Sequence, residues 1–130
     1  MTRTSRIRPK YVPSVSDYKK AFQQIEITEK QKDLLIHHCL MPSHITTAQE
    51  LADFVGYKSY RGVNLQYGKL GMMLVDAIDK DFGNSGVLML FTCVRPNGAT
   101  NENWLLVLRT NVVLALEELD WGVEKTSDLF

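Results

Sequence analysis

Apolar residues recur at helical spacing through the first half of the chain. The first pattern predicts a helix over residues 17–25, capped by Ser16, because its apolar residues lie at i, i+4 and i+7 on one face. The second predicts a helix that begins at a capping box, Thr28 with Gln31, and ends before Pro42. We therefore expect the chain to open with two amphipathic helices.

Two further helical patterns follow, with a short connection between them. The third helix is expected to begin at Thr47, which can form a capping box with Glu50, and to end at Gly56 in a left-handed conformation. The fourth is expected over residues 60–79. Its core face is predicted to carry Val63, Tyr67, Leu70, Leu74, Ala77 and Ile78. Two helices joined by a short glycine-containing turn are typical of the DNA-reading helix-turn-helix.

The second half of the chain changes to continuous apolar runs bounded by polar residues. Residues 87–94 and 104–109 are predicted to be two strands of a hairpin with a long polar tip. Thr110 is expected to cap a last helix over residues 111–119. This order predicts an α+β, mainly α fold: a winged helix-turn-helix with a C-terminal β-hairpin wing and a closing helix.

Length and composition indicate one globular domain. The chain has 130 residues, 45% hydrophobic and 23% charged, values typical of a folded soluble protein. We expect the domain at residues 14–123, after a flexible basic arm at 1–13 and before a polar tail at 124–130. No apolar run reaches the roughly 18 residues of a membrane span, and no signal core follows the basic start. A cytoplasmic protein without a membrane partner is therefore expected.

Net charge does not point to nucleic acid, because 15 Lys and Arg balance 15 Asp and Glu. The distribution of charge has to carry any such argument. The outer face of the fourth predicted helix combines cations with apolar groups: Arg61, Leu65, Lys69, Met72 and Asp76, with Asn64 and Gln66 on its flanks. Arg, Lys, Asn and Gln side chains read base edges and grip phosphates. A solvated polar face accounts for the same residues.

Duplex DNA is the first hypothesis for the ligand. The proposed groove contacts are Arg61, Asn64, Gln66 and Lys69, and the proposed backbone contacts are Lys58, Tyr60 and Arg95. Ser59 can cap the helix and leave its N-terminal amides free for an anion. The basic arm, with Arg3, Arg6, Arg8 and Lys10, can enter a minor groove or remain an unattached tail.

Three stretches around the third and fourth predicted helices carry a family resemblance. They are residues 45–52 (ITTAQELA), 56–60 (GYKSY) and 63–71 (VNLQYGKLG). They resemble the helix-turn-helix-like module at the N-terminus of some bacterial HNH restriction-type endonucleases, a module sometimes found alone. Residues 17–18, 27–31 (ITEKQ) and 116–122 (LEELDWG) extend the likeness over most of the chain.

The resemblance implies a role near DNA in phage or plasmid defence or its regulation, including anti-defence, in a bacterium or a phage. It supplies no catalytic site, because the nuclease part of such proteins lies beyond this module. Two rivals to DNA binding remain open. One is a protein-interaction module, such as an adaptor or inhibitor of a defence nuclease, using exposed Leu65 and Met72. The other is one piece of an enzyme whose catalytic domain lies on another polypeptide.

No pattern of catalytic or metal-binding residues stands out. Residues 62–69 have the wrong spacing for a phosphate loop, and no nuclease or hydrolase motif is present, so we expect neither an enzyme nor a cofactor. Cys39 and Cys93 are predicted to be buried thiols, because both fall in apolar segments without a CxxC spacing. His37 and His38 are expected at the surface or core edge, because neighbouring helix positions point apart and make a zinc site with Cys39 and His44 improbable.

Three glycines lie inside the fourth predicted helix: Gly62, Gly68 and Gly71. Each costs about 1 kcal/mol relative to alanine in a helix. Close packing against neighbouring elements is the simpler reason for them, and close approach to a phosphate backbone is the other.

Overall fold

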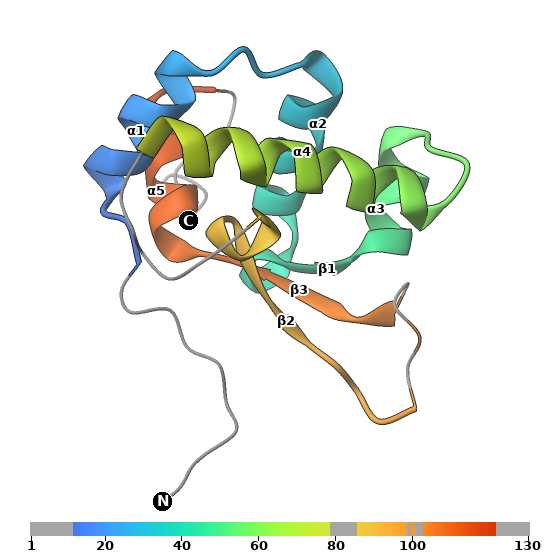
Figure 1. Cartoon of the computed structure of the whole chain (residues 1–130). Coiled ribbons are helices and arrows are strands. Elements are labelled where there is room, and N and C mark those ends of the chain that lie inside the picture. Colours follow the sequence, from blue (N-terminus) through green and yellow to red (C-terminus); the bar gives the residue numbers. More distant parts are fainter. Residues whose placement is uncertain (1–11, 79–85, 99, 101–102, 122–130) are drawn as a thin grey trace, which may run out of the picture.

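The structure is a computed structural model that describes residues 12–78, 86–98, 100 and 103–121 (Figure 1). Within these ranges the chain is α+β and mainly helical, as predicted. Its elements are α1 (Val15–Gln24), α2 (Glu29–Leu40), the 3-10 helix η1 (Pro42–His44), β1 (Ile45–Thr47), α3 (Ala48–Val55), α4 (Tyr60–Ile78), the 3-10 helix η2 (Gly86–Met89), β2 (Phe91–Val94), β3 (Leu105–Leu108) and α5 (Thr110–Glu118). The predicted polar tail and residue 79 lie outside the described residues.

The capping boxes predicted for the second and third helices are confirmed. The Thr28 hydroxyl accepts a hydrogen bond from the Gln31 amide, and the Gln31 side chain accepts one from the Thr28 amide. Thr47 and Glu50 form the same reciprocal pair at the start of α3. Gly56 ends α3 with a φ of 92°, a left-handed conformation that glycine adopts without a steric penalty.

The predicted caps of the first and last helices are wrong. Ser14, rather than Ser16, caps α1, because Ser14 and Asp17 form a reciprocal capping box two residues earlier in the chain. Thr110 is the first residue of α5. Arg109 occupies the N-cap of this helix, and its side chain makes no capping hydrogen bond to the first turn. In these two cases a serine or threonine in the sequence predicted that a helix begins nearby, but it did not predict the residue at which the helix begins.

A three-stranded antiparallel sheet has the order β1-β3-β2. β1 was not predicted; it pairs Ile45 with Val107 and Thr47 with Leu105. The predicted strand at 87–94 is also wrong in its first half, which forms η2 and packs on α4. Arg109 secures this turn, because its Nε donates to the Leu88 carbonyl at 2.8 Å. β3 covers only the middle of the strand predicted at 104–109.

The core lies between the helices and the inner face of the sheet. α4 crosses it and contacts α1, α2, α3 and η2. Its predicted core residues are buried through Leu74, whereas Ala77 and Ile78 are half-buried. The other helices bury Tyr18, Phe22, Leu34, Leu35, Leu51, Val112 and Leu116, and the sheet buries Phe91, Leu106 and Leu108. Trp121 packs edge-on against Phe22 with ring centroids 5.4 Å apart.

Close packing explains two of the three glycines in α4. A methyl group at Gly62 would lie 2.6 Å from the Tyr57 ring, and one at Gly71 would overlap the Gly86 backbone. A methyl group at Gly68 would meet no atom within 4 Å among the described residues. Packing therefore leaves Gly68 without an explanation.

Two predictions of burial need correction. Cys39 is buried, as predicted, but Cys93 is exposed, because β2 runs beyond the helices that cover the other end of the sheet. His38 is fully buried, because both of its ring nitrogens find partners inside the core. Pro13, the last residue of the predicted arm, is buried, and its carbonyl accepts a hydrogen bond from Asn111 Nδ2 at 2.9 Å. Residues 1–11 lie outside the described part.

Figure 1 shows the β2–β3 hairpin extending beyond the helices, so that its far end is left uncovered by the body of the protein. None of the described helices has both the length and the apolar character that a membrane crossing demands.

Candidate nucleic-acid interface

The turn between α3 and α4 positions the start of α4. After Gly56, the Tyr57 ring packs beneath Gly62, and the Lys30 ammonium lies 4.8 Å from the centre of that ring. The Ser59 hydroxyl accepts a hydrogen bond from the Arg61 amide at 3.3 Å, which confirms Ser59 as a cap. The first turn of α4 is thus held by local contacts on both sides.

The outer face of α4 lies in solvent along its length. Its exposed residues are Arg61, Asn64, Leu65, Lys69, Met72 and Asp76. Leu65 and Met72 are 56% and 53% exposed, which is high for large apolar side chains. The helical spacing therefore predicted this face correctly, including its mixture of cations and apolar groups.

Two predicted contact residues are less available than the sequence indicated. Gln66 is half-buried, and its Oε1 accepts a hydrogen bond from Gln31 Nε2 at 3.3 Å, so its carboxamide is engaged between α2 and α4. Tyr60 is also half-buried, and the Arg61 guanidinium lies 6.0 Å from its ring centre. Lys58 is exposed in the turn.

The hairpin contributes Arg95, which is exposed just after β2. Its guanidinium lies over the Trp104 ring, 5.1 Å from the ring centre, which is within the range of a favourable cation–π interaction. Trp104 also lines a hollow of about 240 Å³ between α4 and the hairpin. The other residues around this hollow are Asn64, Val87, Phe91, Cys93 and Leu106.

Sequence analysis did not predict this hollow, although strand periodicity indicates which residues share its face of β2. Alternate residues of a strand share a face, so Phe91, Cys93 and Arg95 lie on one side of β2. The register pairs Cys93 with Leu106. The sequence could not show that α4 lies over this face of the hairpin.

Charge is segregated on the surface in spite of the neutral total. The described residues from 58–75, 86–98, 100 and 103–109 include no Asp or Glu. They include five cations: Lys58, Arg61, Lys69, Arg95 and Arg109. Arg109 is bound within the fold, and the other four are exposed. Among these described residues, the turn before α4, the first half of α4 and the hairpin therefore carry charge of one sign.

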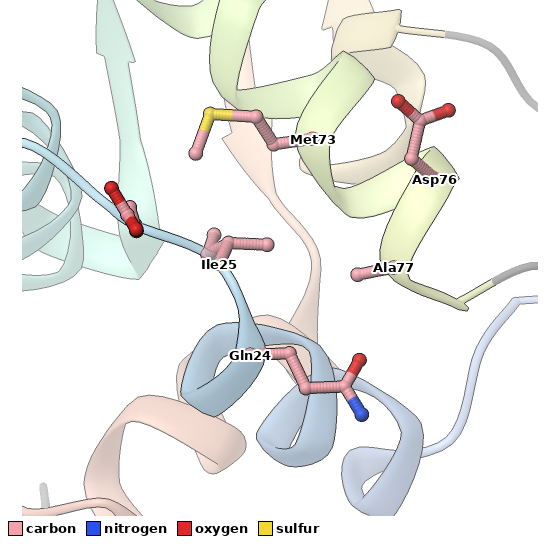
Figure 2. Close-up of a pocket in the computed structure, with 6 residues that line it drawn as sticks. Gln24, Ile25, Met73, Asp76 and Ala77 are labelled. Atoms are coloured by element: carbon pink, nitrogen blue, oxygen red, sulfur yellow. The ribbon is translucent and has the colours of Figure 1, made fainter.

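A second hollow lies at the opposite end of α4, where α1 ends (Figure 2). Its volume is about 370 Å³, and it is lined by Gln24, Ile25, Glu26, Met73, Asp76 and Ala77. Two of these side chains are carboxylates, which repel an anionic ligand. This end of α4 is therefore a poor candidate for nucleic acid.

The histidine cluster does not form a metal site in the part of the chain that the structure describes. His38 has both ring nitrogens engaged, and His37 Nδ1 lies 3.0 Å from the Asp33 carbonyl. His44 Nδ1 lies 2.9 Å from the Cys39 carbonyl.

Comparisons with protein-family models, curated proteins and solved structures found no match to this chain. The resemblance to the endonuclease module rests on the sequence stretches alone.

Proposed function

We propose that this chain binds duplex DNA through α4 and the β2–β3 hairpin, as a winged helix-turn-helix. The observation that carries the proposal is a group of four exposed cations in the turn before α4, on α4 and on the hairpin, with no Asp or Glu among the described residues of 58–75, 86–98, 100 and 103–109. Phosphate contacts supply most of the non-specific affinity for DNA, so the placement of cations matters more than the net charge. Arg61, Asn64 and Lys69 are the proposed groove contacts, with Lys58, Tyr60 and Arg95 at the backbone.

The topology supports the same proposal. α3 and α4 are joined by four residues, a hairpin follows α4, and β1, which precedes α3, completes the sheet by pairing with β3. This arrangement ties the hairpin to the helix-turn-helix, so that both can contact one ligand. Gln66 stands at the margin of the proposed contact surface, because its oxygen is already bonded. A defence-related role remains a proposal that rests on the sequence resemblance.

A mobility-shift titration against a random duplex at two salt concentrations tests the proposal. Arg61→Ala combined with Lys69→Ala should weaken binding clearly, because two exposed cations leave the proposed contact surface. The charge-matched control is Lys19→Ala with Lys20→Ala on α1, where Lys19 forms a surface ion pair with Glu118. Unchanged affinity of the Arg61 and Lys69 double variant would sink the assignment.

A protein-interaction module is the second candidate, favoured by the exposure of Leu65 and Met72 on the same face. Copurification with a defined partner and no DNA shift at low salt would decide for it. Loss of DNA binding in a folded Leu65→Asp variant, with no effect on any partner, would decide against it. An adaptor or inhibitor of a defence nuclease is the form of this candidate that the resemblance indicates.

A further inference from the structure

The hollow between α4 and the hairpin has the character of a binding pocket. Its volume is about 240 Å³, below the roughly 300–1,000 Å³ of pockets that hold drug-sized ligands. One ring system is therefore a better fit than an extended molecule. Phe91 and Leu106 are buried at 3% and 5% exposure and provide an apolar floor.

The walls of the pocket combine a flat ring with one polar group. Trp104 is half-buried and lines the pocket, with the Arg95 guanidinium 5.1 Å from the centre of its ring. Asn64 is the one lining residue with a carboxamide, and it is exposed. A carboxamide offers a donor and an acceptor side by side, the pattern that pairs with the edge of an adenine. Apolar walls with one such group favour a planar heteroaromatic ring.

Cations lie on the elements that form the pocket, α4 and the hairpin. Arg95 lies over the Trp104 ring, and Arg61 precedes Asn64 by one turn of α4. The described residues of these two elements near the pocket, 60–75 and 86–98, include no carboxylate. Charge complementarity therefore favours a ring that carries a phosphate over a neutral aromatic ligand.

We propose that this pocket binds the base of a purine nucleotide, which stacks on Trp104, pairs with Asn64 and directs its phosphate to Arg95. The base can come from a free nucleotide or from a nucleotide turned out of a DNA helix. The inference rests on the proposed DNA-binding function, because it adds a base-binding pocket to the same surface.

Cys93 provides a built-in reporter, because it lines the pocket and is exposed. The chain has only one other cysteine, Cys39, and burial raises the pKa of its thiol to about 12, which keeps it unreactive. Partial burial also raises the pKa of the Cys93 thiol, with Arg95 opposing that effect. The rate of maleimide addition to Cys93 in the whole chain, measured by peptide mass spectrometry, reports occupancy.

Adenosine 5′-monophosphate should slow this alkylation several-fold, and ribose 5-phosphate should not, because it lacks the base. Trp104→Leu keeps an apolar wall but removes the stacking surface, so the protection should disappear. Trp121→Phe is the matched control, because Trp121 packs on Phe22 and does not line the pocket. Equal protection by adenosine 5′-monophosphate and ribose 5-phosphate overturns the inference. A lack of protection by either compound and by DNA also overturns it.

DNA is tested in the same assay with a perfect duplex and a duplex that carries one bulged adenine. Stronger protection by the bulged duplex at equal fraction bound identifies the base as one turned out of DNA. Protection by the mononucleotide with equal effects of the two duplexes identifies a free nucleotide. If only the duplexes protect, and equally, the pocket inference fails.

The proposed DNA binding is judged separately, by the mobility shift of the Arg61 and Lys69 variant. An unchanged shift in that variant, with intact protection by the mononucleotide, would reject the DNA-binding proposal and retain the pocket. A weakened shift in that variant, without protection by the mononucleotide or the bulged duplex, would reject the pocket alone.

Discussion

At the scale of single residues, the three glycines of α4 have different physical reasons. Gly62 and Gly71 make room for Tyr57 and for the Gly86 backbone, whereas Gly68 faces open space among the described residues. An unused glycine in a helix lowers stability, so a packing argument does not explain Gly68. Gly68 lies one turn after Asn64 on α4, and the proposed DNA binding offers a reason for it, because a residue without a side chain lets a phosphate backbone approach the helix closely.

Gly68→Ala should therefore stabilise the fold by about 0.5–1 kcal/mol, because alanine favours a helix and the added methyl group meets no neighbour. It should also weaken binding to duplex DNA, because the methyl group holds the phosphate backbone away. Urea denaturation and the mobility shift measure the two effects. Gly71→Ala is the contrast: its methyl group overlaps the Gly86 backbone, so stability should fall. A stabilised Gly68→Ala protein with unchanged DNA affinity would contradict the role in binding.

His38 links three elements inside the core. Its Nε2 lies 2.9 Å from the Leu106 carbonyl on β3, and its Nδ1 lies 2.9 Å from the Tyr67 hydroxyl on α4. A carbonyl can only accept, so Nε2 carries the proton. The Tyr67 hydroxyl has one proton for two acceptors, His38 Nδ1 at 2.9 Å and the Leu34 carbonyl at 3.3 Å. Burial lowers the pKa of His38 from 6.5 to about 4, with the Leu106 hydrogen bond opposing that effect, so the ring is neutral at neutral pH and Nδ1 accepts from Tyr67.

The stability of the protein should consequently fall as the pH drops from about 6.5 to about 4. In this window the unfolded chain binds a proton at His38 and the folded chain does not, so protons favour unfolding. The lowered pKa corresponds to a loss of about 3 kcal/mol by pH 4. His38→Gln keeps a donor for Leu106 but does not titrate, and its stability should depend less on pH here. If the free energy of unfolding, measured with urea, changed equally with pH in the original protein and in the His38→Gln variant, the assignment of this pH dependence to His38 would be refuted.

At the scale of elements, both reciprocal capping boxes recognised in the sequence predicted their helix starts correctly. Thr28 with Gln31 and Thr47 with Glu50 both form such pairs. Thr110 is instead the first residue of α5 and makes no side-chain cap.

Thr47→Ala should therefore destabilise the protein by about 1 kcal/mol, because the backbone amide of Glu50 loses the hydroxyl that accepts its hydrogen bond. The Glu50 side chain can still accept from the backbone amide of residue 47. Thermal unfolding should show a midpoint lower by a few degrees. Thr110→Ala is the matched control and should change stability by less than about 0.5 kcal/mol, because Thr110 is exposed and does not cap. Equal effects of the two substitutions would contradict the observed caps.

The elements that sequence reasoning missed depend on distant partners. Residues 45–47 form β1 only because they pair with β3, some 60 positions away in the chain. Residues 86–89 are apolar enough for a strand, but they turn into η2, where the Gly86 backbone packs on Gly71. Such tertiary contacts leave no local pattern, so neither element could be derived from spacing alone.

The candidate site shows the same division. The exposed face of α4 followed from helical periodicity, since its residues lie on one element. The pocket beside it needed α4, η2 and both hairpin strands to be placed together, and Trp104 and Cys93 were therefore not identified. Buried His38 was missed for a similar reason, because its two partners lie on α4 and β3.

At the scale of the whole molecule, a total charge of zero conceals two regions of different sign. The hollow between α1 and α4 carries Glu26 and Asp76, whereas the first half of α4 and the hairpin carry cations alone among their described residues. Such a distribution orients a protein toward a polyanion without net attraction at long range. Binding should then depend on a small and countable set of phosphate contacts.

The salt dependence of DNA binding measures that set. Lys58, Arg61, Lys69 and Arg95 are the exposed cations of the surface, so full use of all four predicts that log affinity falls with log salt with a slope of about −3 to −4. On a random duplex the groove-facing cations Arg61 and Lys69 also neutralise phosphates, so Arg61→Ala with Lys69→Ala should bring the slope close to −2, at about 0.9 for each phosphate no longer neutralised. Lys19→Ala with Lys20→Ala removes the same charge from α1 and should leave the slope unchanged. Equal reductions by the two pairs would show that DNA senses only the overall charge, whereas a reduction by the α4 pair alone assigns the contacts to α4.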